Sequence, residues 1–153
     1  MEARRILIPL DGSEMAEAAL PVAESLTGNA DTTLVLVRAT EAPPTLADIA
    51  AVRLDAIAAV ERYLESVATE LRARRFASVE IVPLHGPASS AILEAVRRYE
   101  PDVIVMATSG RARRFVHDSV AETVVRGTPT PVFLVRADDT GRSAQRRGKP
   151  AHV

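Results

Sequence analysis

The sequence predicts an α/β fold, a doubly wound, Rossmann-like sheet of five parallel strands between helices. Five short segments rich in Val, Ile and Leu alternate with segments of helical periodicity, which is the order of repeated βαβ units. Hydrophobic residues make up 47% of the 153-residue chain, whereas aromatic residues make up only 3%. A core of aliphatic side chains is typical of helices that cover a parallel sheet.

The first half of the chain supplies two strands and two helices. A strand over 5–10 ends at the turn Asp11-Gly12-Ser13, and a helix follows to about Leu26. The second strand covers 33–38. After a Pro-Pro break, apolar residues recur at spacings of three to five, which predicts one long amphipathic helix over about 45–74. Its apolar stripe, which we expect in the core, consists of Ile49, Val52, Ile57, Val60, Leu64, Val67 and Leu71.

The second half continues the alternation. We expect strands at 79–84, 102–107 and 131–135, with helices at about 89–99 and 120–126. Gly86-Pro87 begins the turn into the helix over 89–99, whose inner face carries Ile92, Leu93 and Val96. Thr108-Ser109-Gly110 ends the fourth strand. Glycine-containing turns of this kind separate the periodic segments.

Composition limits the organisation and the partners of the protein. We expect one domain over residues 1–136 and a disordered tail over 137–153, which has almost no apolar periodicity. The net charge of −1 gives no electrostatic reason to expect nucleic acid as a partner. No apolar segment has the length needed to cross a bilayer, so we expect no membrane association and a cytoplasmic location. The absence of cysteine excludes disulfides, thiolate zinc sites and cysteine nucleophiles.

A ligand site is expected where the order of strands in the sheet reverses, at the carboxyl ends of the strands. This rule selects the turns Asp11-Gly12-Ser13 and Thr108-Ser109-Gly110. After the second turn, Ser119 and Glu122 have the spacing of a capping box at a helix N-terminus. Free backbone N–H groups and the helix dipole favour an anion there, so we expect the charged end of a ligand at this point. Neither turn matches a dinucleotide-binding glycine motif or a P-loop.

From about Arg5 to Arg136, the chain resembles the universal stress protein family. The matching segments are Ile6–Ser13, Ala16–Leu20, Gly86–Ile92, Asp102–Met106, Gly110-Arg111, Ser119–Glu122 and Pro129–Val132. The resemblance implies a stress-response regulator that binds ATP or another adenine nucleotide, which Mg²⁺ could accompany. The site it implies consists of Pro9, Asp11, Ala39, Met106, Ala107, Gly110, Arg111, Ser119 and Val120.

The sequence departs from the glycine pattern of the ATP-binding branch of the family, Gly-x-x-Gly, nine residues, then Gly-Ser or Gly-Thr. Ala107 replaces the first glycine and Asp118 the third, and only residues 111–117 separate Gly110 from Asp118. A carboxylate beside the helix N-terminus repels phosphate, and a shorter loop offers fewer backbone N–H groups. Arg111 and the arginines that follow it offer cationic donors instead. Nucleotide binding of weakened affinity and no nucleotide binding therefore both stay open.

The sequence leaves three alternative functions for the protein. The first is a regulatory protein with an adenine-nucleotide pocket, and the second is a dimeric interaction module of the same fold that binds no nucleotide and meets unknown protein partners. The third, a nucleotide hydrolase, lacks an evident general base, nucleophile and metal at one site, and we predict no catalytic or metal-binding residue. His85 and His117 have neither an orienting carboxylate nor metal-ligand spacing.

Some of these features also have a purely structural explanation. Asp11, with Glu14 three residues later, is placed to cap the first helix. The last strand, with Phe133 and Leu134, would expose backbone groups and apolar side chains at a sheet edge. Pairing with a symmetry mate would cover them, in agreement with the family's dimerisation through this strand, so we expect a homodimer.

Overall fold

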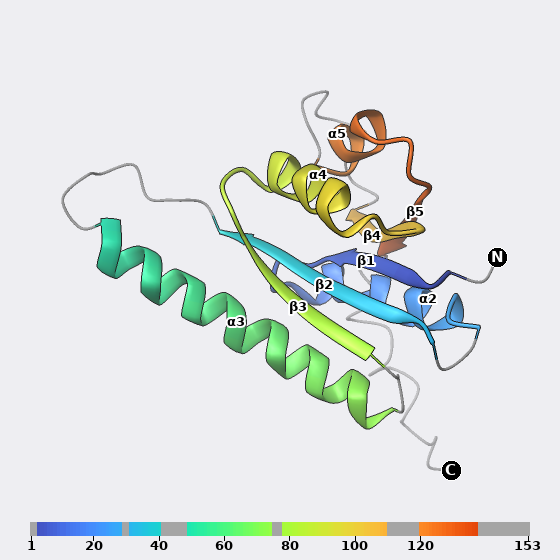
Figure 1. Ribbon diagram of the computed structural model, residues 1–153, viewed down its shortest axis with the longest axis horizontal. Coiled ribbons are helices and arrows are strands. Elements are labelled where there is room, and N and C mark those ends of the chain that lie inside the picture. Colours follow the sequence, from blue (N-terminus) through green and yellow to red (C-terminus); the bar gives the residue numbers. More distant parts are fainter. Residues whose placement is uncertain (1–2, 29–30, 41–48, 75–77, 110–119, 138–153) are drawn as a thin grey trace, which may run out of the picture.

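The computed structural model describes residues 3–28, 31–40, 49–74, 78–109 and 120–137. They form one five-stranded sheet of order β3-β2-β1-β4-β5 in which every neighbouring pair is parallel (Figure 1). The strands are β1 (Arg5–Pro9), β2 (Thr33–Thr40), β3 (Ser78–His85), β4 (Val103–Ser109) and β5 (Val132–Ala137). The helices are α1 (Glu14–Glu17), α2 (Ala19–Ser25), α3 (Ile49–Ala73), α4 (Ala88–Tyr99) and α5 (Val120–Gly127). The predicted doubly wound α/β fold is confirmed.

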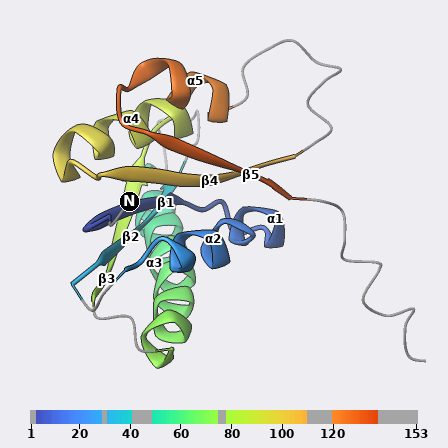
Figure 2. The same ribbon diagram turned by 90° about the vertical axis from the view of Figure 1, so that its right-hand side faces the viewer.

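Helices cover both faces of the sheet. Figure 2 shows α4 and α5 on one face and α1, α2 and α3 on the other. Successive residues of a strand point to opposite faces, so the buried side chains form two separate clusters. In β1, Ile6 and Ile8 belong to the cluster under α1, α2 and α3, whereas Leu7 belongs to the cluster under α4 and α5.

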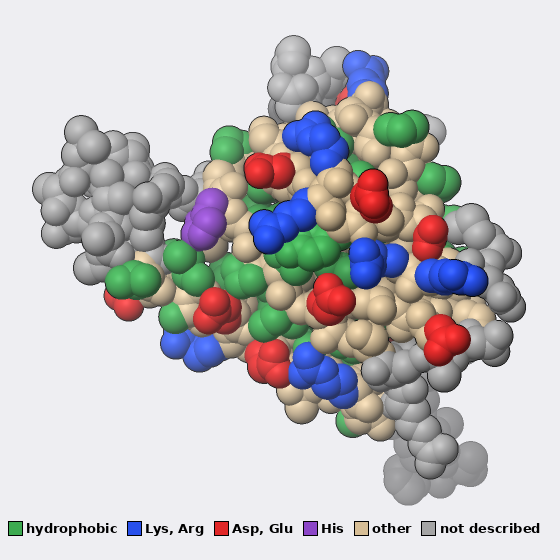
Figure 3. All heavy atoms as spheres, in the orientation of Figure 1, with side chains coloured by type: hydrophobic (Ala, Val, Ile, Leu, Met, Phe, Trp, Pro, Cys, Tyr) green, Lys and Arg blue, Asp and Glu red, His purple; other side chains and the backbone are tan. Residues whose placement is uncertain are grey.

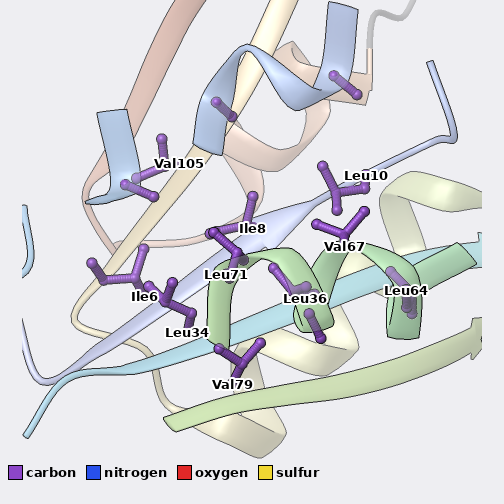
Figure 4. Close-up of a cluster of buried hydrophobic side chains, with 14 of the residues drawn as sticks. Ile6, Ile8, Leu10, Leu34, Leu36, Leu64, Val67, Leu71, Val79 and Val105 are labelled. Atoms are coloured by element: carbon purple, nitrogen blue, oxygen red, sulfur yellow. The ribbon is translucent and has the colours of Figure 1, made fainter. Parts of the chain in front are cut away.

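The cluster under α3 contains most of the predicted apolar stripe. The buried stripe residues are Val60, Leu64, Val67 and Leu71. Leu64, Val67 and Leu71 lie over strand residues such as Leu36 (Figure 4). Ile57 is half-buried, and the side chains of Ile49 and Val52 lie outside the described residues. On the opposite face, Ile92 and Val96 of α4 are buried as expected, while Leu93 is half-buried and packs against the same cluster.

The helix expected after the first turn is two helices rather than one. α1 ends at Glu17 and α2 begins at Ala19, with Ala18 as the cap of both. Pro21 explains the break, because proline has no N–H to donate to the carbonyl of Glu17 four residues earlier. The other described elements agree with their predicted positions to within one or two residues, while residues 45–48 of the predicted third helix lie outside the described part.

Charged side chains of both signs are interspersed over the face that Figure 3 shows. The mixture agrees with the net charge of −1. Three ion pairs of the described residues lie at the surface: Arg72–Glu65, Arg74–Glu24 and Arg126–Glu122. Exposed pairs of this kind add little to stability, so the packing of the two apolar clusters is what holds the helices on the sheet.

Candidate functional site

The candidate site lies at the carboxyl edge of the sheet, at the point where the strand order reverses. β1 is the central strand, with β2 on one side and β4 on the other. β1 and β4 are paired at Ile6–Val103 and Leu7–Ile104, whereas β1 and β2 are paired over five positions. Because the paired stretch of β1 and β4 ends early, their carboxyl halves leave room for a cavity of about 290 Å³. This volume is at the lower end of the range for small-molecule sites.

Six of the nine predicted site residues line this cavity: Pro9, Asp11, Ala39, Met106, Ala107 and Val120. They come from the ends of β1, β2 and β4 and from the first residue of α5. The remaining three, Gly110, Arg111 and Ser119, lie outside the described residues. The structure therefore brings together residues that are as much as 111 positions apart in the chain, from Pro9 to Val120.

The inner wall of the cavity is apolar, while its rim carries polar groups. Val37, Ile92 and Met106 belong to the cluster under α4 and α5 and contribute its inner surface. Among the described lining residues, Asp11 and Arg38 carry charge; Asp11 follows β1, and Arg38 lies near the end of the neighbouring strand β2, two positions before its last residue. The first residues of α5 also line the cavity, so the positive end of this helix dipole faces it.

Asp11 organises the turn after β1 but does not cap α1, which corrects the expected pairing with Glu14. Ser13 is the N-cap, because its Oγ accepts a hydrogen bond from the backbone N–H of Ala16 at 3.1 Å. Asp11 Oδ1 accepts hydrogen bonds from the Ser13 backbone N–H at 2.8 Å and from the Ser13 hydroxyl at 2.5 Å. The carboxylate therefore orients the capping residue from two positions before it. Gly12, between them, has a φ of +87°, a conformation that favours glycine.

Arg38 is a lining residue that the sequence analysis missed. Its guanidinium carbon lies 4.9 Å from the centre of the Tyr63 ring, a cation–π contact between β2 and α3. The Tyr63 hydroxyl in turn donates a hydrogen bond of 2.8 Å to Glu17 of α1. Burial raises the pKa of the Tyr63 phenol above its ordinary value, and the hydrogen bond to Glu17 raises it further. The sequence did contain a signal for Arg38. It is a charged residue near the end of an apolar strand, next to the predicted site residue Ala39.

This arrangement suits a planar group that has an apolar face and carries polar substituents at one side. The apolar wall would contact the ring, and Asp11 could accept a hydrogen bond from a hydroxyl. In the described part of the chain, both hydrogen bonds to this carboxylate go to Oδ1, which leaves Oδ2 for a ligand.

Comparison with known proteins decides the family. Residues 2–136 match the sequence profile described as the Universal stress protein family. The chain belongs to the universal stress protein family. The resemblance found in the sequence is thereby confirmed, since the profile covers nearly the whole of the chain. No curated protein sequence matches the chain significantly.

Solved structures of the family share the fold. A universal stress protein in complex with cAMP superimposes with a TM-score of 0.72 at 18% identity, covering 90% of this chain and 100% of that one. A family member from Arabidopsis thaliana with AMP bound gives 0.65 at 14% identity, covering 88% and 92%. A family member from Burkholderia pseudomallei gives 0.67 at 25% identity, covering 88% and 96%. In the described part of this chain, no helix is long and apolar enough to cross a membrane.

Proposed function

We propose that the protein is a regulatory member of the universal stress protein family that holds an adenine nucleotide in the cavity at the carboxyl edge of the sheet. The observation that carries the proposal is the cavity itself, which opens at the switch point and is lined by six of the residues predicted for a nucleotide. Two proteins of the same fold contain adenine nucleotides, one with cAMP and one with AMP. The expected cytoplasmic location is part of this proposal.

In the proposed complex the adenine ring lies against the apolar wall. Val37 and Met106 are buried beneath this surface, and Ala39 at the end of β2 leaves space beside them. The ribose hydroxyls would donate to Asp11 Oδ2. The phosphate end would lie toward α5, whose N-terminal residues line the opposite side of the cavity. The predicted contribution of Gly110, Arg111 and Ser119 belongs to this phosphate end.

Isothermal titration calorimetry with AMP and ATP tests the proposal. The variant Ala39→Leu fills the cavity from the end of β2, and Ala137→Leu makes the same change at the end of β5, at a residue that does not line the cavity. We expect the wild type and Ala137→Leu to bind alike. Ala39→Leu should bind about fivefold to a hundredfold more weakly, because overpacking costs about 1–3 kcal/mol and 1.4 kcal/mol is a factor of ten.

Two results would remove the proposal. One is the absence of binding heat with the wild-type protein at millimolar nucleotide. The other is an affinity that Ala39→Leu leaves unchanged, since the nucleotide would then lie elsewhere.

We also propose that the protein forms a homodimer through β5. This strand is at the edge of the sheet, and Phe133 and Leu134 are 44% and 48% exposed. An edge strand with large apolar side chains on both of its faces is covered in stable proteins, and a second copy of the same strand can cover it. The interaction-module hypothesis rests on this same edge.

A further inference from the structure

β3 is the edge strand on the side of the sheet opposite β5 (Figure 1). In a parallel pair, a residue whose N–H and C=O groups bond to the neighbouring strand alternates with a residue whose groups point the other way. The backbone N–H of Gly86 donates to the carbonyl of Thr40 in β2 at 3.0 Å, so Gly86 and the even-numbered residues of β3 face β2. The outward-facing residues of β3 are Val79, Ile81, Pro83 and His85.

A side chain of α3 already binds the first outward-facing carbonyl. Arg72, in the last turn of α3, donates a hydrogen bond from Nη2 to the carbonyl of Val79 at 2.9 Å. Its Nη1 lies 2.7 Å from Oε1 of Glu65 on the same helix. An exposed ion pair adds little to stability, but this pair holds the guanidinium at the outer edge of the strand. The guanidinium therefore lies where the backbone of an added strand would have to pair.

Proline closes the edge four residues further along. Pro83 has no backbone N–H, and because it faces outward, the missing donor is one that an added strand would need. Proline within a strand is confined to sheet edges for this reason, which agrees with the orientation of β3. Between Val79 and Pro83, Ile81 is the one outward-facing position. A single position cannot support a second strand, since strands are usually at least about three residues long.

The opposite edge of the sheet has a different character. The six residues of β5 contain no proline. Phe133 and Leu134 add exposed apolar side chains to this edge. Natural proteins protect sheet edges with charged side chains and proline, and β3 carries both. The two edges of the same sheet therefore differ in whether another strand can pair with them.

We propose that Arg72 and Pro83 close the β3 edge to strand pairing, so that a second copy of the chain can extend the sheet only at β5. Glu65 is a positioning residue for Arg72. A chain with two open edges could add copies at both and grow into a continuous sheet, whereas a chain with one open edge stops at two copies. The closure of β3 is independent of nucleotide binding, while the limit of two chains rests on the proposed pairing through β5.

The double variant Arg72→Ala, Pro83→Val reopens the edge, because it frees the carbonyl of Val79 and restores an outward-facing N–H. Combining it with Leu134→Lys in the full chain blocks β5, so association then reports on β3. Sedimentation velocity from micromolar to millimolar protein measures the mass. We expect Leu134→Lys alone to be a monomer and the triple variant to form dimers. With β5 intact, the double variant should form species larger than a dimer, with a mass that rises with concentration.

Hydrogen exchange of the Ile81 amide shows whether association takes place at β3. In Leu134→Lys this outward-facing N–H should exchange quickly, whereas the N–H of Val82, which faces β2, should be protected. In the triple variant the Ile81 amide should become protected. Continued protection of Val82 shows that the sheet stays folded.

Arg74→Ala and Pro87→Val are the matched control substitutions. Arg74 pairs with Glu24 of α2 at 3.2 Å rather than with β3. Pro87 is an exposed proline that lies beyond the end of β3, as the N-cap of α4. Leu134→Lys with both control substitutions should stay a monomer.

The outcomes separate this inference from the proposed pairing through β5. The inference is wrong if the triple variant stays monomeric at millimolar concentration, if it associates while the Ile81 amide stays unprotected, or if the control chain associates as well. If the double variant with β5 intact stops at two chains and its Ile81 amide is protected, the closure of β3 is upheld and the pairing through β5 fails.

Discussion

Three side chains from three elements connect the site to the rest of the protein. Arg38 of β2 contacts the Tyr63 ring of α3, and the Tyr63 hydroxyl donates to Glu17 of α1. Burial and the nearby carboxylate both favour the neutral phenol, so the pKa of Tyr63 lies above its ordinary value. The folded protein therefore binds this proton more tightly than the unfolded chain does.

This raised pKa predicts how stability depends on alkaline pH. Below pH 10.0, the ordinary tyrosine value, both the folded and the unfolded chain keep the proton, and Tyr63 adds no pH dependence. Above it, the unfolded chain loses the proton while the folded protein keeps it, so the free energy of unfolding falls as pH rises. Urea unfolding measures this effect. Between about pH 8 and 11, a range that includes the ordinary tyrosine pKa, the free energy of unfolding should fall more steeply with pH for the wild type than for Tyr63→Phe. Superimposable pH profiles would contradict this account of the network.

At the scale of elements, sequence patterns predicted the strands and helices but not the details of where helices break and which residue caps them. Apolar strands between turn residues were recognisable, because a strand buried on both faces needs apolar residues at every position. The periodicity predicted one helix and missed the break between α1 and α2. This break depends on a single hydrogen bond to Glu17, for which Pro21 has no N–H. Ser13 rather than Asp11 caps α1, because the choice depends on which oxygen reaches the N–H of Ala16.

The edge strand β5 leads to a prediction about assembly. In a dimer through β5, Leu134→Lys places a charge in the apolar contact and should convert the dimer into a monomer. Leu54→Lys changes an apolar residue of α3 that is 68% exposed and should leave the dimer intact. Sedimentation velocity at micromolar protein measures both. A monomeric wild type, or a dimer lost in Leu54→Lys instead, would contradict pairing through β5.

At the scale of the whole molecule, the site results from the winding of the sheet. From β1 the chain adds β2 and β3 on one side of the sheet and later β4 and β5 on the other, and the cavity opens at the carboxyl ends of the strands where this order reverses. The switch-point rule and the family resemblance were enough to predict the place and six lining residues. The contact of Arg38 with Gly12 and Tyr63 could not be predicted, because it joins residues from three separate segments whose distances only the packed helices and sheet determine.

Several expectations fall outside the described part of the chain and stay predictions. One is the phosphate-binding role of Gly110, Arg111 and Ser119. Another is the disordered tail expected over residues 137–153: Ala137 is the last residue of β5, and residues 138–153 lie outside the described part. The participation of Mg²⁺ is also a prediction. None of them is needed for the central claim, which concerns an adenine nucleotide at the carboxyl ends of β1, β2 and β4.

A titration of the ¹⁵N-labelled protein with AMP, followed by ¹H–¹⁵N correlation spectra, tests that claim most directly. We predict saturable shifts of the backbone amides of Asp11, Ala39 and Thr108, which line the cavity, and unchanged amides at Thr33 and Asp102 at the amino edge of the sheet. Unchanged spectra at millimolar AMP, or shifts confined to residues away from the cavity, would contradict it.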